Sequence, residues 1–238
     1  MLYCLDRMIE RYALVPPFLE VGCGQGDVSA HLAVRGFAGR AIDFSPAAVA
    51  QARTRLAAFP AVTVEQMALE DVTGTYRTLI AWDVLEHIED DAAALAHFAR
   101  LLAPGGHLVL AVPSNPREWR WDDDFYGHFR RYTREELGAK LERAGFVPQA
   151  FWDFTWPLFW AMRRAYTRIK RPVAVADDKL TATKASATVN AWQMPLVARM
   201  LHASAPLWRP LRPLQFRLFR HATARGHEFF ALAQKRAG

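Results

Sequence analysis

The chain has 238 residues, of which 52% are hydrophobic and 23% are charged, and its formal net charge is +6. This composition is typical of a globular protein with a substantial core and excludes global disorder. The length suits one large domain, or one domain with an appendage. Two cysteines, Cys4 and Cys23, are too few for a disulfide framework and lack the paired spacing of a zinc site.

The start of the chain and the distribution of its charges indicate where in the cell the protein is located and what kind of partner it binds. Acids and bases occur early, where a signal peptide needs an apolar core, and no run of about 18 apolar residues occurs. We therefore expect a reduced, cytoplasmic protein. Residues 155–226 hold 13 Lys and Arg against only Asp177 and Asp178, a local balance of +11 that leaves −5 for the rest. This asymmetry predicts that the basic segment meets an anionic surface.

Short apolar runs alternate with helical patterns along the rest of the chain. The first run is Phe18–Val21, and glycines and a helical stretch follow it. The next run reaches Asp43, after which Ser45 and Pro46 can cap and start a helix. Later strands are expected at 62–67, 78–83, 107–112 and 146–151, and helices at 91–103 and 133–144. Repeated strand–helix units predict an α/β fold with a parallel, doubly wound sheet.

Glycines at positions 22, 24 and 26 lie between the first strand and a helix. Without side chains, the backbone there can turn sharply and approach a ligand, to which the helix presents free N–H groups. Glycines also end strands for structural reasons, so the loop alone is weak evidence. Asp43 strengthens it, because it ends the next strand, 21 residues after Gly22, where a carboxylate can bind both hydroxyls of a ribose. The usual nicotinamide fingerprint needs glycine at position 27, which is Asp27.

Four ordered segments resemble the class I S-adenosylmethionine-dependent methyltransferases, especially the branch that acts on small molecules. They are LEVGCGQG (19–26), AIDFSPAAVAQAR (41–53), TLIAWDVLEHIEDD (78–91) and LLAPGGHLVLAVPS (101–114). EFFALAQK (228–235) is similar to the family's last, antiparallel strand. The resemblance implies a seven-stranded, Rossmann-like sheet in the order 3-2-1-4-5-7-6. It also implies a cofactor-binding core at 1–154, a helical insertion at 155–226 and a last strand within 227–238.

The resemblance further implies which residues hold the cofactor, S-adenosylmethionine. The expected contacts are Glu20, Gly22, Cys23 and Gly24 around its methionine part, Asp43 on its ribose, Phe44, Met67 and Ala68 at its adenine, and Asp83 after the fourth strand. The chain departs from the family at Met67, where an acid usually binds the adenine amino group. Glu70 and Asp71 are displaced candidates for that acid.

Two histidines are candidates for a general base, which methyl transfer needs in addition to alignment when the acceptor must lose a proton. His87 follows the fourth strand and His128 follows the fifth, so both are expected at the carboxyl edge of the sheet, where ligands bind. His87 could instead order its own loop. Arg130, Arg131 and Tyr132 are expected to contact the acceptor, with a lid or a solvated loop as the alternative.

Asp83, Glu86 and His87 form a possible ligand set for a hard divalent cation. Ubiquinone-type O-methyltransferases carry a similar metal-binding E-x-x-E-H, which here begins with the shorter Asp83. Many relatives keep these residue types only because the fold needs them. The prediction is therefore a site without metal, and cation binding by Asp83, Glu86 and His87 is the alternative.

Residues 156–171 have the pattern of an amphipathic helix. At 100° per residue, one arc holds Leu158, Phe159, Met162, Tyr166 and Ile169, and the rest holds Arg163, Arg164, Arg168, Lys170 and Arg171. A second piece, 208–220, mixes Trp208, Phe216 and Phe219 with arginines. These patterns predict a cap over the active site whose outer face contacts anionic lipid on the inner side of a membrane.

Together these features predict methyl transfer to an oxygen, or a carbon, of a small aromatic or lipid-like acceptor. An RNA methyltransferase that uses the basic insertion is one alternative, which the lack of an RNA-binding module and of an N-P-P-Y-type tetrad disfavours. The other alternative is a cofactor-binding relative without catalysis.

Overall fold

A computed structural model describes residues 2–170, 179, 182–183 and 209–237. Seven strands form one sheet in the order β3-β2-β1-β4-β5-β7-β6, and β7 runs antiparallel to both of its neighbours. The strands are β1 (Phe18–Val21), β2 (Gly39–Asp43), β3 (Val62–Gln66), β4 (Tyr76–Trp82), β5 (Leu102–Pro113), β6 (Phe146–Asp153) and β7 (Glu228–Lys235). The predicted fold class and strand order are confirmed.

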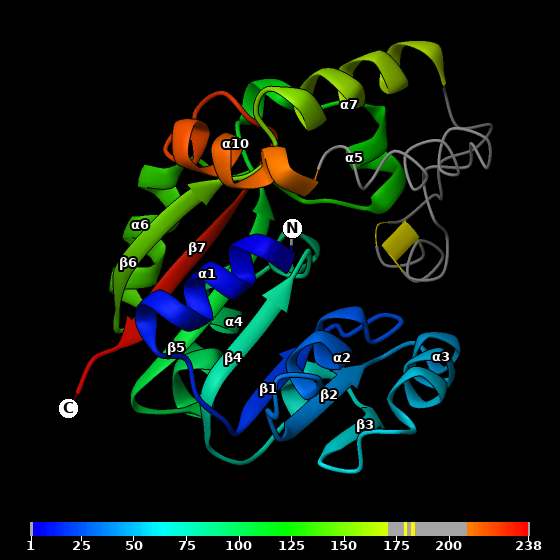
Figure 1. Ribbon diagram of the computed structural model, residues 1–238, viewed down its shortest axis with the longest axis vertical. Helices are drawn as coiled ribbons and strands as arrows, with labels where there is room; N and C mark the ends of the chain where they lie inside the picture. Colours follow the sequence, from blue (N-terminus) through cyan, green and yellow to red (C-terminus); the bar gives the residue numbers. More distant parts are fainter. Residues whose placement is uncertain (1, 171–178, 180–181, 184–208, 238) are drawn as a thin grey trace.

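Helices cover both faces of the sheet (Figure 1). One face carries α1 (Leu2–Tyr12), α2 (Asp27–Ala33) and α3 (Pro46–Leu56), with Met8 and Leu32 in its core. The other face carries α4 (Asp91–Leu101) and α6 (Arg134–Arg143), with Phe98 and Leu137 in its core. Because apolar side chains from helices and strands fill both layers, the sheet is a rigid platform for the loops at its edges.

Three more helices, α5 (Trp121–Tyr126), α7 (Leu158–Ile169) and α10 (Arg212–Phe219), gather beyond the end of the sheet toward which β4 and β5 point (Figure 1). Short 3₁₀ turns are η1 (Leu69–Asp71), η2 (Leu85–His87), η3 (Pro116–Glu118) and η4 (Arg209–Leu211). None of the described helices is long and apolar enough to cross a membrane. The expectations for Arg171 and Trp208 fall outside the described residues.

Local sequence signals explain most of the element ends. The Ser45 hydroxyl caps α3 and the Thr133 hydroxyl caps α6, as the sequence predicts. The helix expected at 91–103 ends at Leu101, because Leu102 pairs with Tyr76 in the sheet and Pro104 cannot continue a helix. The chain therefore enters β5 earlier than the pattern suggests.

Candidate functional site

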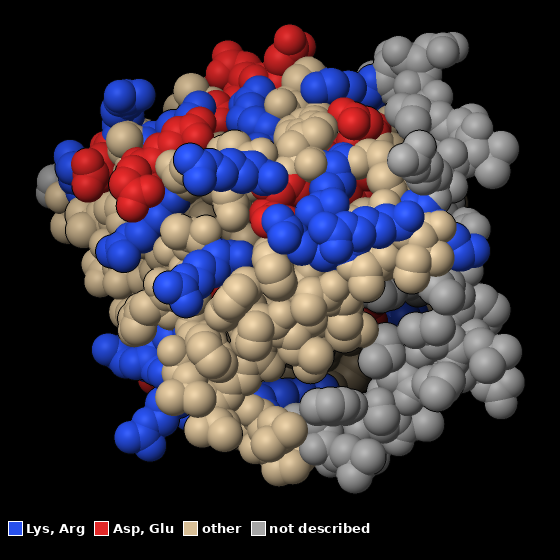
Figure 2. Space-filling model, turned by 90° about the horizontal axis from the view of Figure 1, so that it is seen from above, with Lys and Arg blue, Asp and Glu red and all other residues tan. Residues whose placement is uncertain are grey.

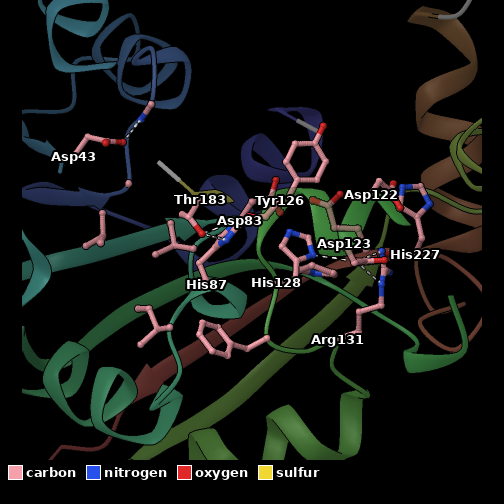
Figure 3. Close-up of a pocket in the computed structure, with 18 of the residues that line it drawn as sticks. Asp43, Asp83, His87, Asp122, Asp123, Tyr126, His128, Arg131, Thr183 and His227 are labelled. Atoms are coloured by element: carbon pink, nitrogen blue, oxygen red, sulfur yellow. Dashed lines mark hydrogen bonds and ion pairs between the residues drawn. The ribbon is translucent and has the colours of Figure 1, made fainter. Parts of the chain in front are cut away.

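A cavity of about 1020 Å³ opens at the carboxyl ends of the parallel strands. Gly22, Gly24 and Asp43 line one part of it, and His87 and His128 line another. The wall formed by α7 adds Phe159, Met162 and Tyr166. Figure 3 shows Asp43 on one side of this space and the histidines on the other. Residues from the glycine loop, the sheet edge and the cap thus face one continuous volume.

The glycine loop and Asp43 are joined by hydrogen bonds. The Gly24 N–H donates to Asp43 Oδ2 over 2.9 Å, and the Ser45 N–H donates to Asp43 Oδ1 over 2.8 Å. Gly22 has a φ of 68°, and a Cβ there would lie 2.5 Å from Val84 Cγ2. The loop therefore requires glycine at position 22, both for its backbone conformation and for its close approach to the chain after β4.

Glu20 and Cys23 are buried beneath the loop and do not line the cavity, and their expected contact with the cofactor's methionine part stays a prediction. The Glu20 side chain points to the face covered by α2, where the Ser29 hydroxyl donates to it, and burial raises the pKa of Glu20 to about 8. Cys23 is buried against Ala41 and Ala52. Both residues support the loop from below.

The adenine end of the cavity contains apolar side chains and one acid. Phe44, Met67, Ala68 and Glu70 line it, whereas Asp71 does not. Arg40 binds Glu65, which does not line the cavity, and a terminal nitrogen of Arg40 lies 3.3 Å from Met67 Sδ. Of the two displaced acids considered from the sequence, Glu70 is the one that the fold brings to the cavity.

The two histidines lie together, with ring centroids 4.8 Å apart and nearly perpendicular planes. His128 Nδ1 is 2.9 Å from Asp123 Oδ1, and His87 Nδ1 is 3.1 Å from the Thr183 hydroxyl (Figure 3). Burial lowers the pKa of His128, although Asp123 opposes that shift, and burial together with His128 lowers the pKa of His87 to about 3. Both rings are neutral at neutral pH. Because a carboxylate only accepts, His128 Nδ1 carries the proton and its Nε2 has a free lone pair.

Glu86 lies beside both rings. Its Oε1 is 4.0 Å from His87 Nε2 and 3.9 Å from His128 Nε2. Within the part of the chain that is described, neither of its buried carboxylate oxygens has a hydrogen-bond partner. Burial, reinforced by the neighbouring Asp83, raises the pKa of Glu86 well above its usual value. A protonated Glu86 at neutral pH avoids an unpaired buried charge.

In the structure, the side chains of Asp83, Glu86 and His87 do not come together as the alternative ligand set for a cation. The ligand atoms that approach one another within 4.8 Å belong to Glu86, His87 and His128, whereas Asp83 is hydrogen-bonded to Glu228. Magnesium and calcium prefer oxygen-rich ligand sets, and two imidazoles with one carboxylate do not provide one. The residues present therefore do not fit the hard cation that the E-x-x-E-H resemblance implies.

The three residues expected to contact the acceptor divide into two groups. Arg131 lines the cavity and binds Asp123 with its Nε over 2.8 Å. Arg130 and Tyr132 do not line it, because both bind Asp91 beside α4, and Tyr132 is fully buried. A bridge between Tyr132 and Ser114 holds this segment against the sheet. In the structure Arg130 and Tyr132 hold the loop through Asp91, and their expected contact with the acceptor stays a prediction.

The cap helix departs from its predicted amphipathic arrangement. Arg163, expected on the solvated basic face, is only 7% exposed and binds Asp122 and Asp123. Phe159 and Met162 face the cavity, while Ile169 from the same predicted stripe is 78% exposed. A buried arginine needs charged partners, and α5 supplies them. The apolar side chains therefore form the wall of the cavity and not a core beneath the cap.

Several cavity residues were not identified from the sequence. They are Asp122, Asp123, Tyr126, Arg163, His227 and Glu228. The run Asp122–Asp124 was a signal, because three adjacent acids at a helix start need cationic partners or solvent. The partner Arg163 is 40 residues away, and no local pattern connects the two.

A comparison with family models matches residues 5–150 to a methyltransferase domain. The chain belongs to this family. Membership confirms the class that the ordered motifs predict and identifies S-adenosylmethionine as the cofactor. The ubiquinone biosynthesis O-methyltransferase of Alkalilimnicola ehrlichii is 34% identical over 108 residues, which cover 42% of this chain and 43% of that relative. The chain thus spans less than half the length of that relative.

Solved structures extend the similarity of fold. A putative sarcosine dimethylglycine methyltransferase from Galdieria sulphuraria has a TM-score of 0.64 and 14% identity, covering 99% of this chain and 84% of its own. Magnesium protoporphyrin IX methyltransferase from Synechocystis, solved with bound S-adenosylmethionine, has a TM-score of 0.51 and 23% identity, covering 63% and 68%. These likenesses support the fold, whereas the acceptor must be argued from the cavity itself.

Proposed function

We propose that the protein transfers a methyl group from S-adenosylmethionine to a hydroxyl oxygen of a small, amphipathic acceptor. The observation that carries the proposal is that the His128–Asp123 pair and the glycine loop line one cavity, to which α7 adds the apolar side chains of Phe159 and Met162. The names of the matched relatives, which are O-methyltransferases, support oxygen as the methylated atom.

The cofactor end fits S-adenosylmethionine by its donor chemistry. Asp43 uses one hydrogen bond at each carboxylate oxygen for the loop, so lone pairs remain for the hydroxyls of a ribose. Gly24 has open space where a Cβ would stand, and Phe44 and Met67 offer an apolar surface to an adenine. When bound, the cofactor supplies a methyl group that is already activated.

His128 is the proposed base. Its Nε2 takes the proton that the acceptor hydroxyl loses while the new carbon–oxygen bond forms, and Asp123 stabilises the resulting imidazolium through Nδ1. The ring is neutral before the reaction because burial lowers the pKa of His128. His87 packs against this ring and keeps its orientation. Alignment of the acceptor in the cavity provides the rest of the rate.

The acceptor is proposed to be an aromatic or lipid-like molecule. Phe159 and Met162 line the cavity from the cap, and Phe129 and Phe154 line it from the core side. Polar groups gather at the histidine end. A molecule with a hydroxyl at one end and an apolar body would match both regions.

The test measures transfer of a labelled methyl group to phenol, 4-propylphenol and 4-heptylphenol. We expect turnover to increase with the alkyl chain, because a longer chain buries more apolar area against the wall. Replacing His128 by Asn should lower turnover by about 10²-fold or more with the affinity for S-adenosylmethionine retained. His87→Asn is the comparison and should lower turnover less, because His87 contacts the His128 ring but does not take the proton.

Three outcomes would contradict parts of this proposal. Full activity of His128→Asn would show that alignment acts without this base. Tight cofactor binding without transfer to any phenol would favour a relative without catalysis, and loss of activity on chelation would favour a metal at the histidine end.

We also propose that the outer face of the cap contacts an anionic membrane, where lipid-like acceptors are found. Leu214 and Leu218 of α10 are exposed, as is Ile169 of α7. Exposed cations on the same helices include Arg168 and Arg212, and Figure 2 shows basic side chains gathered on the face seen from above. Such a surface suits anionic lipid, with about 1 kcal/mol for each cation near the headgroups.

Vesicle flotation tests this contact. Arg168→Glu combined with Arg212→Glu should reduce retention on phosphatidylglycerol vesicles at low salt while leaving cofactor affinity unchanged. Arg164→Glu is not used in this test, because Arg164 binds Glu118. Wild-type protein that does not float with these vesicles would refute the membrane contact.

A further inference from the structure

Asp123 holds His128 with one carboxylate oxygen and is itself held through the other. Its Oδ1 binds His128 Nδ1 over 2.9 Å and Arg131 Nε over 2.8 Å. Its Oδ2 accepts the Arg120 N–H over 2.8 Å and a nitrogen of Arg163 over 2.9 Å. A carboxylate held at both oxygens cannot rotate about its bond to Cβ. The direction in which Asp123 presents Oδ1 to the imidazole is therefore fixed in part by Arg163.

Arg163 comes from the cap and has no other place in the proposed chemistry. Its Nε and one terminal nitrogen form two parallel bonds to Asp122, of 2.8 and 2.6 Å, and its other terminal nitrogen donates to the Glu118 carbonyl over 3.0 Å. This planar fork, buried and bonded at every nitrogen, is a geometry that lysine cannot reproduce. The cap helix is thus attached to α5 next to the histidine.

The same helix forms the apolar wall of the acceptor end. Met162, which lines the cavity, precedes Arg163 in the chain, and Phe159 lies one turn earlier. Trp121 of α5 donates its indole N–H to the Thr167 carbonyl over 2.8 Å, which fixes the next turn of α7. A shift of α7 would therefore move both the apolar wall and the Arg163 guanidinium that binds Asp123.

We propose that Arg163 is a positioning residue that orients the Asp123–His128 pair, so that docking of the cap helix on α5 sets both the acceptor wall and the direction of the His128 ring. The inference rests on the proposed function for its consequence in catalysis. Its structural part concerns the imidazole alone and can be measured without turnover.

The experiment follows the His128 ring by nitrogen NMR of protein labelled with ¹⁵N-histidine, with the signals assigned by comparison with His128→Asn. In wild-type protein we expect one tautomer, protonated at Nδ1. Arg163→Gln should move the His128 signals toward the averaged values of a ring that exchanges tautomers. Arg163→Lys, which keeps the charge but loses the fork, should give an intermediate shift.

Arg164→Gln is the matched control, because Arg164 is the next residue on the same helix and binds Glu118 but not Asp123. It should leave the His128 signals unchanged. With 4-heptylphenol as the acceptor probe, Arg163→Gln should lower kcat by about tenfold or more, Arg164→Gln should change it by less than about twofold, and cofactor affinity should be the same in both.

Folded Arg163→Gln with an unchanged His128 signal would overturn the proposal and leave Arg163 as a tie between helices. If Arg163→Gln does not fold, the same result for Arg163→Lys overturns it. A protein that methylates none of the phenols would contradict the proposed function, while the NMR result would still decide the role of Arg163.

Discussion

The two ends of the cavity are built by different means. The cofactor end consists largely of backbone, with Gly22 and Gly24 in left-handed conformations and Asp43 bonded to two amide groups nearby. The acceptor end consists of side chains, in which Asp123 joins His128 and Arg131 from the loop after α5 and Arg163 from α7. A site made of backbone tolerates few substitutions within a short motif. A site made of buried ion pairs can change its acceptor by changing partners that are distant in the sequence.

The cofactor end should show the largest effect of a single added methyl group. Gly22→Ala places a Cβ against Val84 in a left-handed backbone, so we expect a loss of about 2–3 kcal/mol in stability and a comparable loss in cofactor affinity. Gly24→Ala is the control for stability alone, because its backbone is also left-handed but its Cβ would meet no protein atom within 4 Å. Thermal unfolding measures the loss of stability and calorimetry with S-adenosylmethionine measures the loss of affinity, and equal losses of stability in the two variants would contradict the proposed requirement for close approach at Gly22.

Asp43 should show the next largest effect. Removing its carboxylate in Asp43→Ala deletes the partners of the Gly24 and Ser45 amides as well as the proposed ribose contact. We expect cofactor binding to weaken by about 1–3 kcal/mol without unfolding of the domain. Calorimetry measures this loss, and Glu70→Gln is a comparison at the adenine end with a smaller expected effect. Unchanged affinity in Asp43→Ala would refute the placement of the ribose.

Substitutions in the acceptor wall should change KM for the acceptor and not the affinity for the cofactor. Phe159→Asp places a charge in the apolar wall, so KM for 4-heptylphenol should rise about tenfold or more, which corresponds to about 1.4 kcal/mol. Ile169→Asp, on the exposed end of the same helix, should leave KM unchanged. Steady-state kinetics with both variants decide the point. Equal KM values would show that α7 does not contact the acceptor.

The smallest expected effect is a pH dependence of stability from Glu20 beneath the loop. Burial raises its pKa to about 8, so its protonated form favours the folded state, and this contribution is lost as the pH rises from its ordinary value of 4.5 through 8. Glu20→Gln should therefore gain stability relative to wild type between pH 5 and pH 8, by roughly 2–4 °C in Tm for each kcal/mol.

Exposed Glu10→Gln is the control for this comparison and should show no such gain. Asp83, with a pKa raised by burial to about 7, contributes in the same direction in both proteins, so only the difference between variant and wild type is diagnostic. A difference that stays constant with pH would contradict the raised pKa of Glu20.

The sequence by itself predicted the alternation of strands and helices and the glycine loop at the edge of the sheet, whereas the order of the strands came from its resemblance to the methyltransferases. Alternating strands and helices, the glycine loop and Asp43 at the next strand end are local patterns, and a parallel sheet brings the carboxyl ends of its strands to one edge. His87 and His128 were placed at the cavity for the same reason. Helix α1 has a strongly amphipathic pattern with Leu5 and Met8 on its buried face, and that periodicity would have revealed it.

Tertiary structure alone decided the acceptor end. Periodicity put Arg163 on a solvated face, yet the cost of burying its charge is offset by Asp122 and Asp123, which lie 41 and 40 residues earlier in the chain. Arg130 and Tyr132 are residue types that often contact ligands, but in the structure both bind Asp91 on α4 and do not line the cavity. Helical and strand periods report which side chains share a face. They do not report which distant charge a face will meet, because that depends on how the elements dock.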